Sequence, residues 1–242
     1  MNPRTKTLFH FTKSLDVLVQ ILKEGFWPQY SLEDITWLGV SNKSKIAVPM
    51  VSFCDIPISR LQNHTKKYGD YGVGLCRERW RPTGINPVFY ISPDSMVKRE
   101  LGELLLETSK NPNPRLRTTG IVTLANCKPL VGKNPDEDFY SECEWRFFPW
   151  VEGVGGENKY NFLLSEAEFR DEKIRKEANL ERRKNRMLEF YPDDVRYLLV
   201  RTKTEVPMLI NFIETNLSGH SRLELDLLKT RIIVFDELSS DL

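Results

Sequence analysis

The sequence lacks the marks of several common protein classes. It contains four cysteines among 242 residues, and they form no C-x-x-C pair and have no cluster of histidines nearby. A structural zinc site and a disulfide framework are therefore poorly supported, and we expect no metal. No apolar run approaches the roughly 20 residues that a membrane-spanning helix requires. The first residues do not resemble a signal peptide. We therefore expect a cytoplasmic protein with no membrane partner.

An excess of charge of one sign is also missing. The chain has 35 basic and 34 acidic residues, so its formal net charge is +1. This balance provides no long-range field for attracting nucleic acid or an anionic membrane. The chain also has no G-x-G-x-x-G or Walker A loop, so a nucleotide would have to bind by another geometry. At this length, with 40% hydrophobic residues, the chain can bury a core as one domain, 1–242.

Hydrophobic periodicity and turn residues predict an α+β fold of short strands interrupted by helices. Ser14 is a plausible N-cap, and Gly25 a plausible stop, for the first helix. Strands are predicted at 5–12, 48–57, 70–80, 85–92, 120–132, 139–151, 195–202 and 230–238. Helices are predicted at 14–25, 58–69, 95–109, 165–190 and 205–217, and the highly charged 165–190 segment is expected to be a solvated helix with i,i+4 ion pairs.

The segment "FYSECEWRFF" places two acids two positions apart in an otherwise apolar and aromatic stretch. In an extended strand, Glu142, Glu144 and Arg146 all project from the same face. Adjacent like charges repel unless a cation or a ligand hydroxyl satisfies them. One interpretation is an amphipathic strand with its charged side in solvent, or a local ion-pair ladder. The other is a site in which Arg146 keeps the two carboxylates ionised.

A second polar group lies on the first predicted strand, "LFHFT". His10 and Thr12 share one face of it, and Phe9 and Phe11 share the other. The simplest interpretation is that the phenylalanines fill the core while His10 faces solvent. The alternative is that the polar pair lines a pocket closed by the helix that follows.

Two further stretches carry aromatic and small residues. Ser52 and Phe53 end a predicted strand, and Tyr68 and Tyr71 lie beside a glycine-rich stretch, 69–74. The glycines would let the backbone approach a flat ligand closely, with a tyrosine as the stacking wall. The alternative is a plain turn with two surface tyrosines.

The blocks "LFHFT", "VPMVSFCDIP", "NHTKKYGDYGVGL" and "FYSECEWRFF" in this order resemble the AbiGi family of bacterial abortive-infection (phage-resistance) proteins. The resemblance covers most of the first 150 residues, and "FYPDDVRYLLVRT" extends it toward the C-terminus. It implies a role in anti-phage defence. Because the labels of that family include an antitoxin-type description, it also implies a possible cognate toxin or antitoxin partner.

A more distant resemblance is to the ADP-ribosyltransferase superfamily, which includes DarT-type toxins. An early strand with H-x-T, a helix ending in glycine and a late strand with E-x-E carry it. It implies a core of mostly antiparallel strands at about 5–150 and 191–238, with a charged helical insertion at about 165–190. It also implies NAD as co-substrate, with a nucleic acid or a protein as acceptor.

The same resemblance implies roles for individual residues. His10 and Thr12 would hold a ribose, Glu144 would be the catalytic glutamate, and Glu142 would orient or deprotonate the acceptor. A fixed carboxylate favours the positive charge that builds on the ribose as the nicotinamide bond breaks. Tyr68 or Tyr71 would stack on nicotinamide, with Phe53 behind them. Ser52 only partly matches the serine of the arginine-specific class, whose other marks are absent.

The leading hypothesis is therefore a phage-defence ADP-ribosyltransferase. The alternative from another class is a non-catalytic antitoxin or sensor that binds a partner protein or nucleic acid, in which the acids form a structural ion-pair ladder. A third possibility is a nuclease or phosphotransferase acting on RNA. The near-neutral charge and the lack of an extended basic cluster weigh against tight RNA binding.

Overall fold

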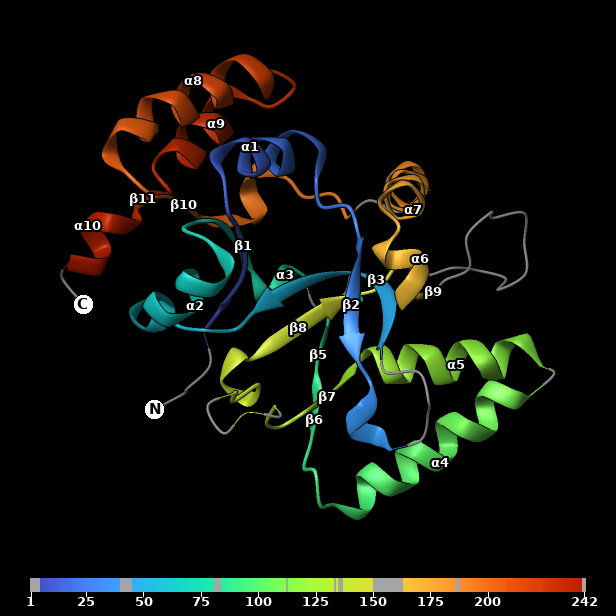
Figure 1. The fold of residues 1–242 in the computed structure, drawn as a ribbon. Coiled ribbons are helices and arrows are strands. Elements are labelled where there is room, and N and C mark those ends of the chain that lie inside the picture. The colour runs from blue at the N-terminus through green and yellow to red at the C-terminus, as the bar shows by residue number, and fades with distance from the viewer. Residues whose placement is uncertain are drawn as a thin grey trace. The chain divides into compact units, whose positions relative to one another are not determined.

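The computed structural model describes residues 5–39, 45–80, 84–111, 113–132, 134, 137–149, 163–185 and 188–240. Over these residues the fold is α+β, as predicted (Figure 1). The chain divides into two compact units, each built from separated segments. The first unit comprises Met1–Phe26, Ser52–Gly84 and Leu188–Leu242, and the second comprises Trp27–Val51 and Ile85–Met187. Strand β3 (Lys45–Cys54) contributes residues to both units.

The first unit is built on a mixed sheet in the order β11-β10-β4-β1-β3. Strand β1 (Thr7–Thr12) is antiparallel to β4 (Tyr71–Cys76) on one side and to the end of β3 on the other. Strand β10 (Val195–Val200) is antiparallel to β4 and parallel to β11 (Ile232–Val234). The predicted first strand and the strand at 195–202 are thus confirmed with shorter bounds. The strand predicted at 70–80 is confirmed over Tyr71–Cys76 and wrong beyond it, because a helix, Arg77–Trp80, follows.

Helices of the first unit pack against this sheet. Helix α1 (Leu15–Glu24) begins where Ser14 accepts a hydrogen bond from the Val17 amide, and it ends at Gly25 with φ of 81°, as the sequence predicts. The predicted last strand is wrong beyond Val234, because helix α10 begins at the next residue. The remaining helices are α2 (Leu61–Tyr68), α3 (Arg77–Trp80), α8 (Val206–Asn216), α9 (Arg222–Lys229) and α10 (Phe235–Ser240), with short 3-10 turns at Ile58–Arg60, Pro192–Asp194 and Lys203–Glu205.

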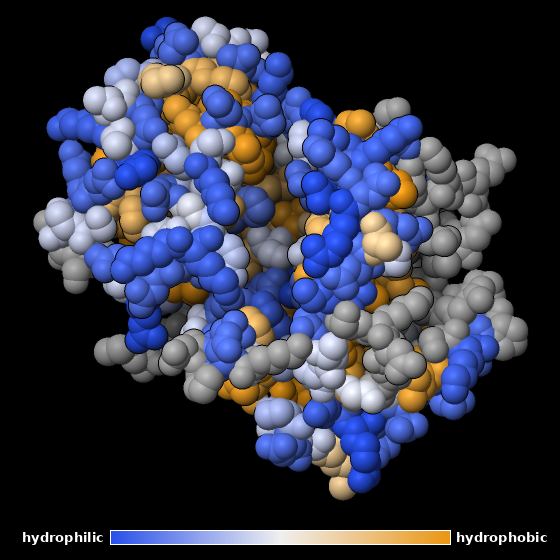
Figure 2. All heavy atoms as spheres, viewed as in Figure 1, coloured by the Kyte–Doolittle hydropathy of each residue, from blue (hydrophilic) through white to orange (hydrophobic). Residues whose placement is uncertain are grey.

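Hydrophobic side chains are exposed over the helices α1, α8 and α9 of the first unit (Figure 2). Val17 on α1, Met208 on α8, and Leu223 and Leu227 on α9 are all more than two-fifths accessible to solvent. Leu223 and Leu227 lie four positions apart and therefore share one face of their helix. The opposite, buried side of α9 carries Leu225 and Leu228.

The glycines of strand β4 make room for aromatic rings of the neighbouring strand. Gly74 lies opposite Phe9 in the register of β1 and β4. A Cβ at this position would lie 2.7 Å from the Phe9 ring and 2.9 Å from Thr7 Cγ2, and a Cβ at Gly72 would lie 3.1 Å from the Phe11 ring. The predicted close approach at these glycines is therefore made by β1 side chains of the protein itself.

The second unit contains shorter strands. Strand β3 is antiparallel to β2 (Gln29–Asp34) and to β9 (Leu164–Ser165). Two further pairs are β5 (Asn86–Pro87) with β8 (Glu144–Phe147), antiparallel, and β6 (Phe89–Ile91) with β7 (Cys127–Pro129), parallel. The helices are α4 (Met96–Lys110), α5 (Pro114–Ala125), α6 (Glu166–Arg170) and α7 (Glu172–Asn185), with 3-10 turns at Thr36–Leu38 and Tyr140–Glu142.

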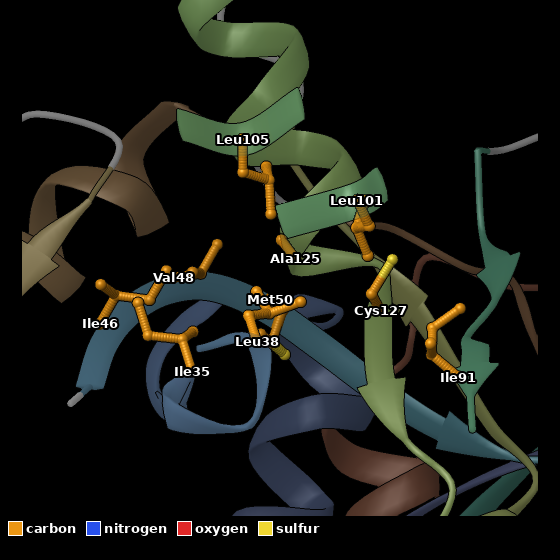
Figure 3. Close-up of a cluster of buried hydrophobic side chains, with 10 residues drawn as sticks. All are labelled: Ile35, Leu38, Ile46, Val48, Met50, Ile91, Leu101, Leu105, Ala125 and Cys127. Atoms are coloured by element: carbon orange, nitrogen blue, oxygen red, sulfur yellow. The ribbon is translucent and has the colours of Figure 1, made fainter. Parts of the chain in front are cut away.

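An apolar cluster joins these elements (Figure 3). Leu101 and Leu105 come from α4, Ala125 from the end of α5 and Cys127 from β7, and they meet side chains of β3 such as Val48. The other members are Ile35, Leu38, Ile46, Met50 and Ile91. Burying a Leu, Ile, Val or Met side chain contributes about 1.5–3 kcal/mol, so this cluster stabilises the unit through its eight residues of these types.

Two helical regions differ from the sequence prediction. The segment 120–132 is not one strand, because α5 continues to Ala125 and only Cys127–Pro129 is extended. Asn113 starts this helix by accepting a hydrogen bond from the Arg115 amide, and α5 packs along α4. The segment 165–190 is interrupted at Asp171, whose extended backbone ends α6 and whose carboxylate caps α7.

The charged segment is also less solvated than expected. Its i,i+4 ion pairs Arg170–Glu166 and Lys176–Glu172 are present and exposed. However, Ala178 and Arg182 on α7 are buried, and the Arg182 guanidinium donates to the Tyr30 hydroxyl at 3.3 Å. One face of α7 is therefore part of the core of the second unit. Within the described ranges, no helix combines the length and the apolar character needed to cross a bilayer.

The fit of Gly74 against Phe9 predicts the effect of adding one methyl group. In the Gly74→Ala variant, the Phe9 ring, which is 1% exposed, has to move within a packed sheet. We expect the free energy of unfolding to fall by about 1–3 kcal/mol in urea titrations. Gly219→Ala is the matched control, because no atom lies within 4 Å of a Cβ there. Equal stability of the two variants would contradict the prediction, because it would mean that the Phe9 ring can move without a loss of stability.

Candidate functional site

The "FYSECEWRFF" segment of the second unit is a turn followed by a strand, and not one continuous strand. Glu142 ends a 3-10 turn, Cys143 has a left-handed backbone with φ of 44°, and β8 begins only at Glu144. The prediction of an extended segment through Glu142 is therefore wrong, because the chain bends at Cys143. The bend still brings both carboxylates to one partner.

That partner is Lys128 on β7. Its Nζ donates to Glu142 Oε2 at 2.6 Å and to Glu144 Oε2 at 3.2 Å, and it lies 4.5 Å from the centre of the Phe139 ring. Burial alone would lower the pKa of Lys128, but the carboxylates of Glu144 and Glu142 outweigh it and hold the pKa above its ordinary value. The Lys128 ammonium between the two carboxylates offsets the repulsion expected between Glu142 and Glu144.

Arg146 is the second cation of the network and is 1% exposed. Its Nε and Nη2 donate to the two oxygens of Glu144 at 2.8 and 3.0 Å, and Nη2 also donates to Glu33 Oε2 at 3.0 Å. Its Nη1 donates to the carbonyl of Ala125 at 2.8 Å. Burial would lower the pKa of Arg146, but Glu33 and Glu144 raise it, so the guanidinium stays charged.

The face of β8 that carries these charges is therefore the buried one. Glu142 and Glu144 are 8% and 9% exposed, whereas Trp145 and Phe147 are only half-buried. The interpretation of an amphipathic strand with its charges in solvent is wrong, because both carboxylates are buried. Ion pairs are present, from Arg146 to Glu144 and from Lys128 to both acids, and the functional role of the two acids stays a prediction. The backbone amide of Glu144 also donates to the Tyr90 hydroxyl at 2.7 Å, and burial raises the pKa of Tyr90.

A pocket of about 800 Å³ lies beside this network in the second unit. Glu33 and Lys128 belong both to the network and to the pocket wall. Cys127 also lines it, and burial raises the pKa of its thiol to about 11. Most of the wall is apolar, and the cluster of Figure 3 contributes five residues to it, Ile35, Ile46, Val48, Ala125 and Cys127. Pockets of this size and composition are typical small-molecule sites.

The other candidate residues lie in the first unit. His10 is partly buried on β1, and its Nδ1 lies 2.9 Å from the carbonyl oxygen of Ser52. Because a carbonyl only accepts, Nδ1 carries the proton of this bond, and in the neutral ring Nε2 is then an acceptor. The ring makes edge contacts with Phe26 and Phe53 at 5.1 and 5.8 Å. Burial lowers the pKa of His10, although the bond to Ser52 partly opposes the shift.

The remaining candidates surround the other end of β1. Thr12 is buried and lies opposite Tyr71 in the register of β1 and β4. The Tyr71 hydroxyl donates to Glu205 Oε1 at 2.5 Å, and burial together with this carboxylate raises the pKa of Tyr71 to about 12. Tyr68 ends α2, where its ring lies 4.4 Å from the His64 ring and carries Lys67 over its face.

The structure thus groups the predicted residues in two sets. His10 contacts Ser52 and Phe53, and Thr12 lies opposite Tyr71, all within the first unit. Glu142 and Glu144 belong to the second unit. Sequence reasoning missed Lys128 and Glu33, and of the two aromatic partners of His10 it named Phe53 and missed Phe26. No local pattern marks these residues, because each reaches its partner across a long stretch of chain. Their catalytic and NAD-binding roles stay predictions.

Within the described part of the chain, no group of three or more His, Cys, Asp and Glu side chains is arranged to hold a metal ion. All four cysteines are free thiols. The described site therefore consists of the carboxylates of Glu33, Glu142 and Glu144, the cations Lys128 and Arg146, and an apolar pocket beside them.

Comparison with known proteins assigns the chain to a family. The family model described as "Putative abortive phage resistance protein AbiGi, antitoxin" matches residues 24–201, which include the whole carboxylate network and the pocket. The chain belongs to the AbiGi family. A relative from Lactococcus lactis subsp. cremoris, the "Abortive phage resistance protein AbiGi", is 27% identical over 255 residues, covering 90% of this chain and 99% of the relative. No solved structure matches this AbiGi chain.

The AbiGi network predicts a large cost for removing its central cation. In Arg146→Ala, Glu144 and Glu33 lose their partner in a buried setting, so we expect the free energy of unfolding to fall by about 3–5 kcal/mol. Arg170→Ala removes an exposed pair on α6 and should cost less than about 0.5 kcal/mol. Urea titrations measure both. Similar costs for the two variants would mean that the buried pairs contribute no more than a surface pair.

The lowered pKa of His10 predicts a pH dependence of stability. The folded state disfavours the charged ring, so its contribution is complete above the ordinary pKa of 6.5 and is lost as the pH falls through that value toward the folded pKa. His10→Asn should remove this component, which amounts to at most about 1.4 kcal/mol per pH unit. Urea titrations between about pH 5 and about pH 8 measure it. A profile in His10→Asn that matches that of the unaltered protein would contradict the prediction.

Proposed function

We propose that this AbiGi-family chain is the antitoxin-type component of an abortive-infection system and that it restrains a cognate toxin protein by binding it. The family description carries the word antitoxin. The observation that supports it in this chain is the engagement of the two predicted catalytic carboxylates. Glu144 receives two N–H groups of Arg146 and the Lys128 ammonium, and Glu142 receives the same ammonium.

A buried carboxylate held by two cations, as Glu144 is, stabilises the folded structure. Catalytic stabilisation requires a group whose interaction strengthens in the transition state, and charges already neutralised by buried partners have little left to offer. The Glu144 oxygens each accept a hydrogen bond from a guanidinium that is itself buried. The network therefore favours the non-catalytic hypothesis. A cytoplasmic location and a protein partner belong to this proposal.

The proposal is tested by depletion in the native host. An antitoxin that is withdrawn frees its toxin, so depletion of this chain should arrest growth, and its re-expression should restore growth. Expression of the chain alone in a host without the rest of the system should be harmless. If the chain is a transferase effector, the results are reversed: its depletion is harmless, and its expression alone arrests growth. That opposite pair would rule out the antitoxin role.

An NAD-dependent ADP-ribosyltransferase of the corresponding fold is a second candidate, with a nucleic acid or a protein as acceptor. It is favoured by the contacts of His10 with Ser52 and Phe53, three residues expected at the NAD site. Labelled NAD incubated with the purified protein and a cell lysate tests it. If Glu144 is catalytic, Glu144→Gln loses NAD consumption while the exposed Glu137→Gln keeps it. No consumption by the unaltered protein, or equal consumption by all three, removes the assignment.

A further inference from the structure

The pocket of the second unit has a chemistry that neither the antitoxin role nor the family description uses. Its wall is mainly apolar and includes the aromatic residues Trp37 and Phe139. Cavities of about 300–1,000 Å³ with apolar walls and a few convergent polar groups are the usual form of small-molecule sites. The volume of about 800 Å³ lies in this range. The charged side chains of the wall determine which charge such a molecule would carry.

Charges on the wall favour a cation. Glu33, Asp34 and Glu137 contribute three carboxylates, and Lys98 and Lys128 contribute two ammonium groups, which leaves one negative charge in excess among the described lining residues. Lys128 is paired with Glu142 and Glu144, and Glu33 is paired with Arg146, so the excess remains with the acids Asp34 and Glu137 against the cation Lys98. The field inside the pocket is therefore negative.

The network behind the wall increases this excess. Among the described residues it contains the carboxylates of Glu33, Glu142 and Glu144 and the cations Lys128 and Arg146, again one negative charge more than positive. Glu33 is the most accessible acid of the three, with a side chain 23% exposed, and it faces both the guanidinium and the pocket. Glu33 Oε2 accepts from Arg146, and in the part of the chain that is described Oε1 accepts only from the neutral Ser31 hydroxyl, so the pocket side of this carboxylate is the position for an added ammonium group.

The aromatic walls suit the same ligand. The Phe139 ring already accepts the ammonium of Lys128 over its face at 4.5 Å. Trp37 is partly buried against the apolar cluster and is a lining residue of the pocket. Aromatic faces attract cations and also stack with flat apolar groups.

We propose that this pocket binds a small amphipathic cation, an organic amine whose apolar body lies against Trp37 and the aliphatic wall and whose ammonium group lies beside Glu33. The inference concerns the second unit alone and does not depend on the antitoxin proposal. The expected ligand carries one positive charge on a flat or aliphatic body of drug-like size.

The probes are tryptamine and indole propionate, which share an aromatic body and carry opposite charges. Calorimetric titration of the full chain measures affinity, and the indole N–H resonance of Trp37, assigned with Trp37→Phe, reports the position of binding. Tryptamine should shift that resonance and bind at least about tenfold more tightly than indole propionate, because the same field attracts one and repels the other. Added salt should weaken tryptamine binding.

Two lining variants give opposite predictions and spare the buried network. Lys98 has no hydrogen-bond or ion-pair partner for its ammonium among the described residues, so Lys98→Gln should leave the melting temperature unchanged and tighten tryptamine binding about threefold. Glu137 is exposed, and glutamine keeps an oxygen to accept the hydrogen bond from Asn134, so Glu137→Gln should weaken binding about threefold.

The proposal fails if the Trp37 resonance does not respond to tryptamine. It also fails if indole propionate binds as tightly as tryptamine or more tightly, or if Lys98→Gln weakens tryptamine binding. A response of Trp37 together with the predicted order of affinities and the opposite effects of the two variants supports it.

Discussion

The buried guanidinium of Arg146 is the group on which the polar core of the second unit depends. Its partners come from three separate places in the chain: Glu144 at the start of β8, Glu33 near the end of β2, and the last carbonyl of α5 at Ala125. Removing a charged group from water costs several kcal/mol unless each donor finds an acceptor. These three elements are consequently held in one arrangement, in which a displaced strand would leave a buried charge without its partner.

The same requirement explains the pair of glutamates that stood out in the sequence. A Glu-x-Glu pair with a nearby arginine suggested either catalysis or a ladder of ions. Lys128 between the two carboxylates and Arg146 across Glu144 make the ladder, and they turn the charged side of the strand inward. This geometry gives the protein an ordered acidic region at a pocket wall.

Local patterns predicted much of the fold. The cap at Ser14 and the stop at Gly25 fixed the first helix, and short β-prone runs located the strands β1, β4 and β10. Such signals fail where tertiary packing competes. The β-branched residues at 121–123 favoured a strand, but the cap at Asn113 and the packing on α4 make that segment helical.

The site was less predictable than the fold, because its partners are distant in sequence. Glu33 lies 113 positions from Arg146, and Lys128 lies 14 positions from Glu142. No periodicity connects residues across such separations, so only the folded chain reveals which cation neutralises which acid. For His10, the division of the strand into two faces was predictable, but the simplest interpretation, a ring facing solvent, is wrong, because the ring packs against Phe26 and Phe53.

Neighbouring strands of the first sheet are far apart in the chain and are therefore synthesised at different times. Strand β4 ends at Cys76, but its outer neighbour β10 begins only at Val195. At a synthesis rate of about 5–20 residues per second, this edge of β4 stays open for on the order of ten seconds. An open β-edge is a template for pairing with other chains. The nascent protein therefore passes through a stage at risk of aggregation that the finished sheet, with β10 and β11 in position, no longer shows.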